Sequence, residues 1–276
     1  MFRRWSARLV ILIALVTGHW NTLVGPRHAQ CAMAGDEVSR RTSAGDDLVK
    51  TARQRVKKWS QVGMWLPEKD VPFFKDNYAI LQPALADAIA DSSDAIRQNA
   101  LYVVREIGPT ALPLEPLLAK RIEVEPDRTV RLYLYSTARS IGAKSDHTLA
   151  LMKERYAALE TQPDIRVHDY DHTPVDERIE LAAALLRLDD QLERRADYRD
   201  LILRWLKPAP KDLRAGRQEA YWDHRWIAVN VIENCGGPRE AIPLLQAMLK
   251  EPHRKAWVYI KVSRALAALG VGSRSN

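Results

Sequence analysis

Apolar residues recur through the middle and C-terminal parts of the chain in a pattern that repeats every 34 or 47 residues. Each copy starts at an anchor position and carries mostly apolar residues three, four, seven and ten positions later. The anchors are Arg97, Arg131, Arg178, Arg225 and Tyr259. Because this spacing places the apolar side chains on one face of an α-helix, the pattern predicts five amphipathic helices.

A second apolar segment precedes each of these helices. These segments are Tyr78–Ala90, Ala111–Arg121, His147–Leu159, Tyr198–Leu206 and Glu240–Lys250. Glycine closes four of the five copies, as is typical of helix C-termini, and no stretch alternates as a half-buried strand would. The sequence therefore predicts an all-α fold of about five stacked helix hairpins over residues 78–270, followed by a short tail, 271–276. The expected units are 78–108, 109–142, 143–189, 190–236 and 237–270.

The first copy runs from Asp94-Ala95-Ile96-Arg97 to Ile107-Gly108-Pro109, and the second, from Asp127 to Gly142, is nearly the same. This order of residues resembles HEAT repeats of the short bacterial type, including those named after phycobilisome lyases. Two departures are Asp189 in place of the third closing glycine and Tyr259 in place of the last arginine. The resemblance implies a right-handed α-solenoid but little chemistry, because such scaffolds carry many functions. Action on a bilin chromophore would follow from the family naming alone, and it fits poorly with the export predicted below.

Two neighbouring units are longer than the others by 13 residues each. The first insertion is about Thr161–Val175, which is acidic and contains histidine, and the second is about Pro208–Ala220, which is mildly basic. Both fall between the two helices of a unit, so both loops are expected at one edge of the solenoid. Insertions in repeat proteins often form the binding face.

Residues 1–34 have the layout of a secretory signal peptide. Arg3, Arg4 and Arg8 precede the apolar run 9–16, and Ala32-Met33-Ala34 is a small-x-small cleavage pattern. The apolar run is much shorter than the roughly 20 residues that span a bilayer. The sequence thus predicts cleavage after Ala34 and an extracytoplasmic location, periplasmic or secreted, with no membrane span afterwards. An uncleaved anchor is the alternative.

Removal of this segment changes the charge of the chain. The net charge of the whole chain is +7, but the first 34 residues hold four arginines and no acid, so the mature chain has 38 basic against 35 acidic residues. An excess of +3 gives no reason to expect a nucleic-acid partner. The segment 35–77 is expected to form an N-terminal cap and connector. A flexible start at Gly35–Arg41 precedes a capping helix at Asp46–Trp59, which covers the first repeat.

Motifs for phosphate-binding loops, zinc proteases and serine hydrolases are absent from the sequence. The best candidate for metal binding is the run His168-Asp169-Tyr170-Asp171-His172, whose imidazoles and carboxylates are ligands that divalent metals such as zinc accept. The alternative is a solvated polar loop. We predict no cofactor and no metal, and we keep His168, Asp169, Asp171 and His172 as the metal candidates.

A second candidate for chemistry is the aromatic segment 221–226. Tyr221, Trp222 and Trp226 with Asp223 are similar to the aromatic and acidic residues of HEAT-like DNA glycosylases. The simpler interpretation is a helix start at Trp222, with Asp223 near the positive end of the helix dipole. An enzyme with its site around 168–172 and 221–226 is the alternative function.

The anchor arginines recur at equivalent positions, which indicates that they bridge neighbouring units rather than form a basic ladder. In HEAT proteins the second helix of each hairpin lines the concave surface, and the same is expected of the helices that carry the anchors. The more polar positions of these helices, two, five and nine residues after each anchor, are expected to face that surface. The candidates for partner binding at these positions are Tyr102, Glu106, Tyr133, Glu180, Arg187, Asn230, Lys261 and Arg264. Mixed charge with tyrosine and asparagine favours a protein or peptide partner. The expected function is that of an exported, non-enzymatic scaffold or adaptor.

Overall fold

The computed structural model describes residues 27–61, 67–162, 173–211, 215–251 and 256–271; of these, residues 27–43, 215–220, 235 and 256–257 are described by their backbone alone. The described residues are helical and contain no strand, so the chain is all-α, as predicted. It divides into residues 1–44 and residues 45–276, of which the second holds all of the predicted repeats.

The helices have the following bounds. They are α1 (Arg27–Gln61), α2 (Val71–Asp76), α3 (Tyr78–Ile89), α4 (Asp94–Ile107), α5 (Glu115–Val124), α6 (Arg128–Ile141), α7 (Asp146–Glu160), α8 (Pro174–Leu188), α9 (Arg195–Leu206), α10 (Ala215–Cys235), α11 (Ala241–Leu249) and α12 (Ala256–Ala268), with 3₁₀ helices η1 (Glu68–Asp70) and η2 (Gly108–Leu114).

Eleven of these helices correspond to the eleven that the sequence predicts, ten in the repeats and one in the cap, and three details differ. Helix α1 includes Gly35–Arg41, where a flexible start was expected. Residues 108–114 form a 3₁₀ turn, because Pro109 and Pro113 lack the N–H groups that a continuous helix needs. Helix α10 begins at Ala215 rather than Trp222, so Asp223 does not lie in its first turn, and the predicted dipole contact of Asp223 is wrong.

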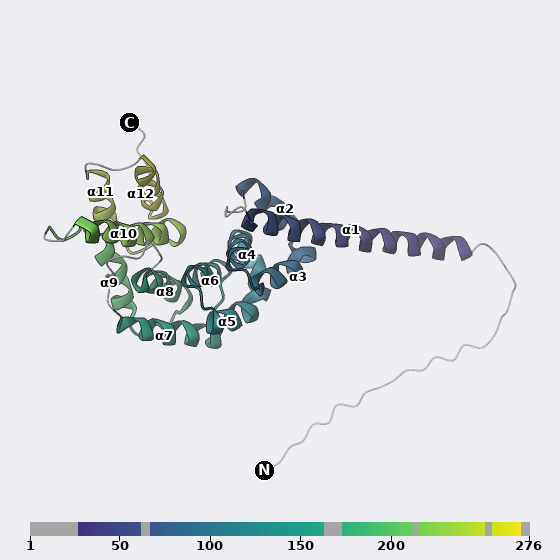
Figure 1. Cartoon of the computed structure of the whole chain (residues 1–276), viewed down its shortest axis with the longest axis horizontal. Coiled ribbons are helices and arrows are strands. Elements are labelled where there is room, and N and C mark those ends of the chain that lie inside the picture. The colour runs from purple at the N-terminus through teal and green to yellow at the C-terminus, as the bar shows by residue number, and fades with distance from the viewer. Residues whose placement is uncertain (1–26, 62–66, 163–172, 212–214, 252–255, 272–276) are drawn as a thin grey trace, which may run out of the picture. The chain divides into compact units, whose positions relative to one another are not determined.

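The helices of residues 45–276 contact one another in a regular order (Figure 1). Each of α4, α6, α8, α10 and α12, here called the anchor helices, packs against the helix that precedes it in the same predicted unit. Each anchor helix also packs against the next anchor helix, from α4 through α12. Among the preceding helices, α3 contacts α5, α5 contacts α7 and α9 contacts α11. Neighbours in the chain are therefore also neighbours in space.

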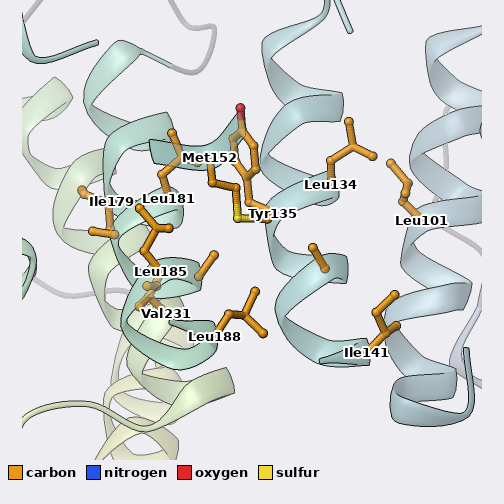
Figure 2. Close-up of a cluster of buried hydrophobic side chains, with 14 of the residues drawn as sticks. Leu101, Leu134, Tyr135, Ile141, Met152, Ile179, Leu181, Leu185, Leu188 and Val231 are labelled. Carbon is orange, nitrogen blue, oxygen red and sulfur yellow. The ribbon is translucent and has the colours of Figure 1, made fainter. Parts of the chain in front are cut away.

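One apolar core runs through these contacts. The positions three, four and seven after each anchor are buried in the first four copies, as predicted, and Figure 2 shows Leu101, Leu134, Tyr135, Leu181 and Leu185 among them. In the last copy Ser263 is exposed. Among the described residues α12 packs only against α10 and α11, so part of its surface has no helix to cover it.

Side-chain caps and glycines fix several helix ends. Thr173 and Asp176 form a capping box at the start of α8, in which each side chain accepts a hydrogen bond from the backbone N–H of the other. At the end of α6, Gly142 has φ 80° and the Ala143 N–H donates to the Ala138 carbonyl at 2.8 Å. That left-handed conformation favours glycine and closes the helix with satisfied carbonyl groups.

Three anchor arginines bridge neighbouring units, as the sequence predicts. Each donates two hydrogen bonds to one carboxylate of the next unit in the chain. The pairs are Arg97 with Glu125, Arg131 with Glu177 and Arg225 with Glu251. Arg97 and Arg131 also donate to the backbone carbonyl groups five and six residues before them. Paired guanidinium and carboxylate groups of this geometry are the form in which buried charge is tolerated.

The third anchor makes a contact within its own unit. The Arg178 guanidinium lies over the ring of Tyr156, 5.7 Å from its centroid. Helix α9 is followed by Lys207 and Pro208, where α5 and α11 are followed by Glu125 and Glu251. The bridging prediction is confirmed for the other three arginines and stays a prediction for Arg178.

The C-terminal part of α1 packs on the first predicted unit. Ala52 and Val56 are buried in the common core. The Ser60 hydroxyl donates to the Ala95 carbonyl at 3.1 Å and accepts from the Asn99 amide at 3.0 Å. These hydrogen bonds attach the end of α1 to the first turns of α4. Among the described residues, none of the helices combines the length and the apolar character needed to cross a bilayer.

Candidate functional site

Two adjoining cavities open on the polar face of the anchor helices. The smaller, of about 230 Å³, is lined by side chains from all five anchor helices, from Arg105 on α4 to Lys261 on α12. The larger, of about 560 Å³, is lined from α4, α6, α8 and α10. Both include Arg105, Ser136 and Asn234. We call the two together the central groove.

Six of the eight candidate residues line the central groove. The smaller cavity includes Tyr133, Glu180, Asn230 and Lys261, and the larger includes Glu106 and Arg187. The helical period explains this arrangement, since positions two, five and nine after successive anchors fall on the same side of neighbouring helices. The remaining two candidates do not line it. The Tyr102 ring lies under the guanidinium of Arg105, a groove residue, at 5.1 Å. Arg264 is 3.6 Å from Glu233, the carboxylate that also pairs with Lys261 of the groove.

Several charges of the central groove are paired with one another. Arg139 donates to Glu180 at 3.0 Å, and both side chains are almost fully buried. Lys261 lies 2.9 Å from Glu233, and Arg105 lies 3.1 Å from Glu106. Arg187 is exposed, and no ion pair of its side chain is found among the described residues. The groove thus offers a mixed surface with one cation available to a ligand.

Two tyrosines add neutral donor and acceptor groups. Burial raises the pKa of Tyr133 and of Tyr102 above the usual value, so both phenols keep their protons at neutral pH. A phenol next to arginine and asparagine can contact a peptide through its ring and through its hydroxyl group. The described lining of the central groove therefore combines neutral hydrogen-bonding groups with paired charges.

The metal candidates cannot be placed. His168, Asp169, Asp171 and His172 lie outside the described residues. Within the part of the chain that the structure describes, no group of three or more histidine, cysteine or acidic side chains could hold a metal ion.

The aromatic segment 221–226 does not form one open site. Tyr221 is buried, with its ring centroid 4.9 Å from that of Trp205. Trp222 lies under Arg225 at 4.1 Å, and Trp226 lies under Lys261 at 5.8 Å. The side chains therefore serve three different contacts, and the structure does not bring them together as an aromatic pocket.

Sequence reasoning missed a buried pair between α8 and α10. His224 Nδ1 lies 2.7 Å from Asp176 Oδ1, and both side chains are nearly inaccessible to solvent. The other ring nitrogen of His224 is buried without a hydrogen bond, and the Trp205 ring packs edge-on against the imidazole at 4.7 Å. The Thr-x-x-Asp capping signal at 173–176 pointed to Asp176, but nothing local indicated a histidine 48 residues away. A histidine enclosed in this way cannot reach a substrate, so the pair is a link between helices.

We expect His224→Ala to lower the free energy of unfolding by about 2–3 kcal/mol, since it leaves Asp176 buried with fewer partners and opens a cavity. Urea denaturation followed by circular dichroism measures this. In a double-mutant cycle with Asp176→Ala, the two losses should not be additive, because both changes remove the same bond. Additive losses would mean that the two groups are not coupled.

Comparison of the chain with protein-family models, with curated proteins and with solved structures finds no match.

Proposed function

We propose that this protein is an exported, non-enzymatic adaptor that binds a protein or peptide partner through the central groove and the two insertion loops. The observation that carries the proposal is the groove itself, in which polar side chains from five successive anchor helices line one continuous pair of cavities.

We further propose that the helices form a right-handed α-solenoid of HEAT type with the anchor helices on its concave side. Two observations support this arrangement. Each anchor helix contacts the next one in chain order. Arg105 on α4 and Asn234 on α10 line the same cavities, although α6 and α8 lie between their helices in the order of contacts. Side chains of non-adjacent helices can meet in this way when a stack of repeats curves toward them.

The chemistry of the groove favours a protein partner over a nucleic acid. Arginine, tyrosine and asparagine are typical of protein interfaces, whereas a phosphate backbone requires a row of available cations. Of the basic residues in the groove, Arg139, Lys261 and Arg105 already face carboxylates at 3.1 Å or less. A partner would therefore need a mixed surface of its own.

The insertion loops supply the second part of the proposed interface. The first follows α7 and the second follows α9, so both occupy the same place in neighbouring units. Residues 163–172 of the first insertion and 212–214 of the second lie outside the described residues. Residues 215–220 of the second form the start of α10, so the predicted loop is shorter than expected. We propose that residues 1–34 direct export and are removed after Ala34, and that the partner is extracytoplasmic.

Photo-crosslinking in the native host tests this function. We expect a crosslinking amino acid at Asn234, in the groove, to give a discrete adduct in the extracytoplasmic fraction, and the same amino acid at Lys120, an exposed position on α5, to give none. Replacing residues 163–171 and 209–214 by glycine and serine of equal length should weaken the adduct. The same adducts from both positions, or none from Asn234, would contradict the proposal.

A further inference from the structure

A further cleft, of about 610 Å³, adjoins the central groove. It lies where the ends of α8 and α10 meet the first half of α9 and the connection from α10 to α11. Its floor is apolar and buried, formed by Ala183, Ile202, Val231 and Ile232. Arg187 lines both this cleft and the larger cavity of the central groove, so the two surfaces are continuous.

The rim of this cleft is strongly basic. Four arginines line it, and Glu240 is the one acid among its lining residues. The arginines are Arg187, Arg195, Arg199 and Arg239. We call this region the arginine cleft.

A cleft beside the corresponding connection one unit earlier has a different charge. It lies between α7 and the connection from α8 to α9 and has about 770 Å³. Three basic residues line it with four acids, Asp146, Asp189, Asp190 and Glu193. A basic rim is therefore not a general feature of the connections between units.

The arginines of the arginine cleft are only partly neutralised. Arg199 pairs with Glu240. Arg195 donates to the carbonyl groups of Leu186 and Asp189, which carry no full charge. Arg187 and Arg239 are exposed, and no hydrogen bond or ion pair of their side chains is found among the described residues. The guanidinium groups of Arg187 and Arg239 thus lie at the rim of an apolar floor and can bind carboxylates.

We propose that the arginine cleft binds an acidic segment of the partner as an extended peptide, with carboxylates on Arg187 and Arg239 and apolar side chains on the floor. A guanidinium group binds a carboxylate through two parallel hydrogen bonds. The apolar floor distinguishes this occupant from a bare polyanion, which would gain nothing from Ile202 or Val231. The inference rests on the proposed function, since it names the chemistry of the same partner.

Fluorescence anisotropy with the full-length protein tests this inference without the natural partner. The probe is a labelled synthetic peptide, Gly-Leu-Asp-Glu-Leu-Asp-Glu-Gly, and its neutral counterpart carries asparagine and glutamine instead. We expect the acidic peptide to bind at least about tenfold more tightly than the neutral one. The variant Arg187→Gln/Arg239→Gln should raise the Kd for the acidic peptide about tenfold.

The control is Lys120→Gln/Lys250→Gln, which removes the same charge from two exposed positions outside the arginine cleft. We expect it to change the Kd by about twofold or less. Equal Kd values for the two double variants would overturn the inference. A second outcome would also overturn it. If heparin or inorganic phosphate displaced the peptide, and this displacement also depended on Arg187 and Arg239, the cleft would recognise anions in general.

The outcome is separable from that of the crosslinking experiment. An adduct at Asn234 with no binding of the acidic peptide would overturn the arginine cleft as the recognition site and leave the adaptor function standing. If the peptide bound in a way that depended on Arg187 and Arg239 but no adduct formed at Asn234, the arginine cleft would be supported as a peptide-binding site. The proposal that the partner binds in the central groove would be contradicted.

Discussion

Glu177→Gln is expected to lower the free energy of unfolding by about 3 kcal/mol and the midpoint of thermal unfolding by about 10 °C. Glu177 is fully buried at the start of α8 and accepts hydrogen bonds from Arg131 and Arg155 at 2.7–3.1 Å. The Tyr135 hydroxyl also donates to it, at 3.0 Å. The neutral amide would leave the surrounding guanidinium groups without their shared counter-charge.

The variant should also change the cooperativity of unfolding. Arg131 belongs to the second predicted unit and Glu177 to the third, so their pair couples two neighbouring units. In repeat proteins, stability depends on such interfaces between neighbours. We expect a broader denaturant transition than in the unmodified protein. The free energy of unfolding should also depend less steeply on urea concentration.

Glu123→Gln is the matched control, since it makes the same chemical change at an exposed position of α5. Circular dichroism during urea and thermal denaturation gives the stability of the unmodified protein, Glu177→Gln and Glu123→Gln. If Glu177→Gln unfolded at the same urea concentration as Glu123→Gln, the negative charge of Glu177 would contribute nothing to stability beyond what a neutral amide provides.

The arrangement of the helices could be predicted from the sequence because it depends on a local period. Apolar residues three, four and seven positions after an anchor lie on one helix face whatever surrounds them, and Leu101, Leu134 and Leu181 are buried accordingly. The start of α10 was misplaced by seven residues, because residues 215–221 carry no apolar period and a helix was not expected there.

The partners of the anchor arginines could not be predicted. The carboxylates lie 28, 46 and 26 residues after Arg97, Arg131 and Arg225, so no fixed spacing marks them. An insertion between the helices of the third unit separates Arg131 from Glu177 in the sequence without separating the helices in space.

The central groove was predicted in part. The period identified the helix face that carries Tyr133, Glu180 and Asn230, but it omitted Arg105 and Arg139, which stand eight positions after their anchors. Those positions border the polar face, and only the packing of neighbouring helices decides whether they join it. Of the four arginines of the arginine cleft, only Arg187 was among the candidates. Arg195 and Arg199 belong to α9, which is not an anchor helix, and Arg239 belongs to the connection from α10 to α11, so the polar positions of the anchor helices did not include them.

Acid is expected to destabilise the protein mainly between about pH 5 and pH 2. Burial alone would raise the pKa of Glu177, but hydrogen bonds from Arg155 and Arg131 and their positive charges outweigh burial and lower the pKa to about 2. The pKa of Glu125 is also lowered: burial raises it, and the hydrogen bonds from Arg97, the Asp127 N–H and Arg121 outweigh that effect. Their stabilising contribution is complete above the pKa of the unfolded chain, about 4.5, because both states are then ionised.

As the pH falls below about 4.5, the unfolded chain takes up protons before the folded protein does, and stability decreases until the folded carboxylates are protonated too. The shift of Glu177 from 4.5 to about 2 corresponds to roughly 3 kcal/mol. Urea denaturation at several values between about pH 7 and pH 2 measures this slope. Glu177→Gln should be less stable at neutral pH and should lose less on acidification, because glutamine does not titrate, whereas Glu123→Gln should follow the unmodified protein. Parallel curves for Glu177→Gln and the unmodified protein would contradict the assignment, since the acid sensitivity would then originate elsewhere.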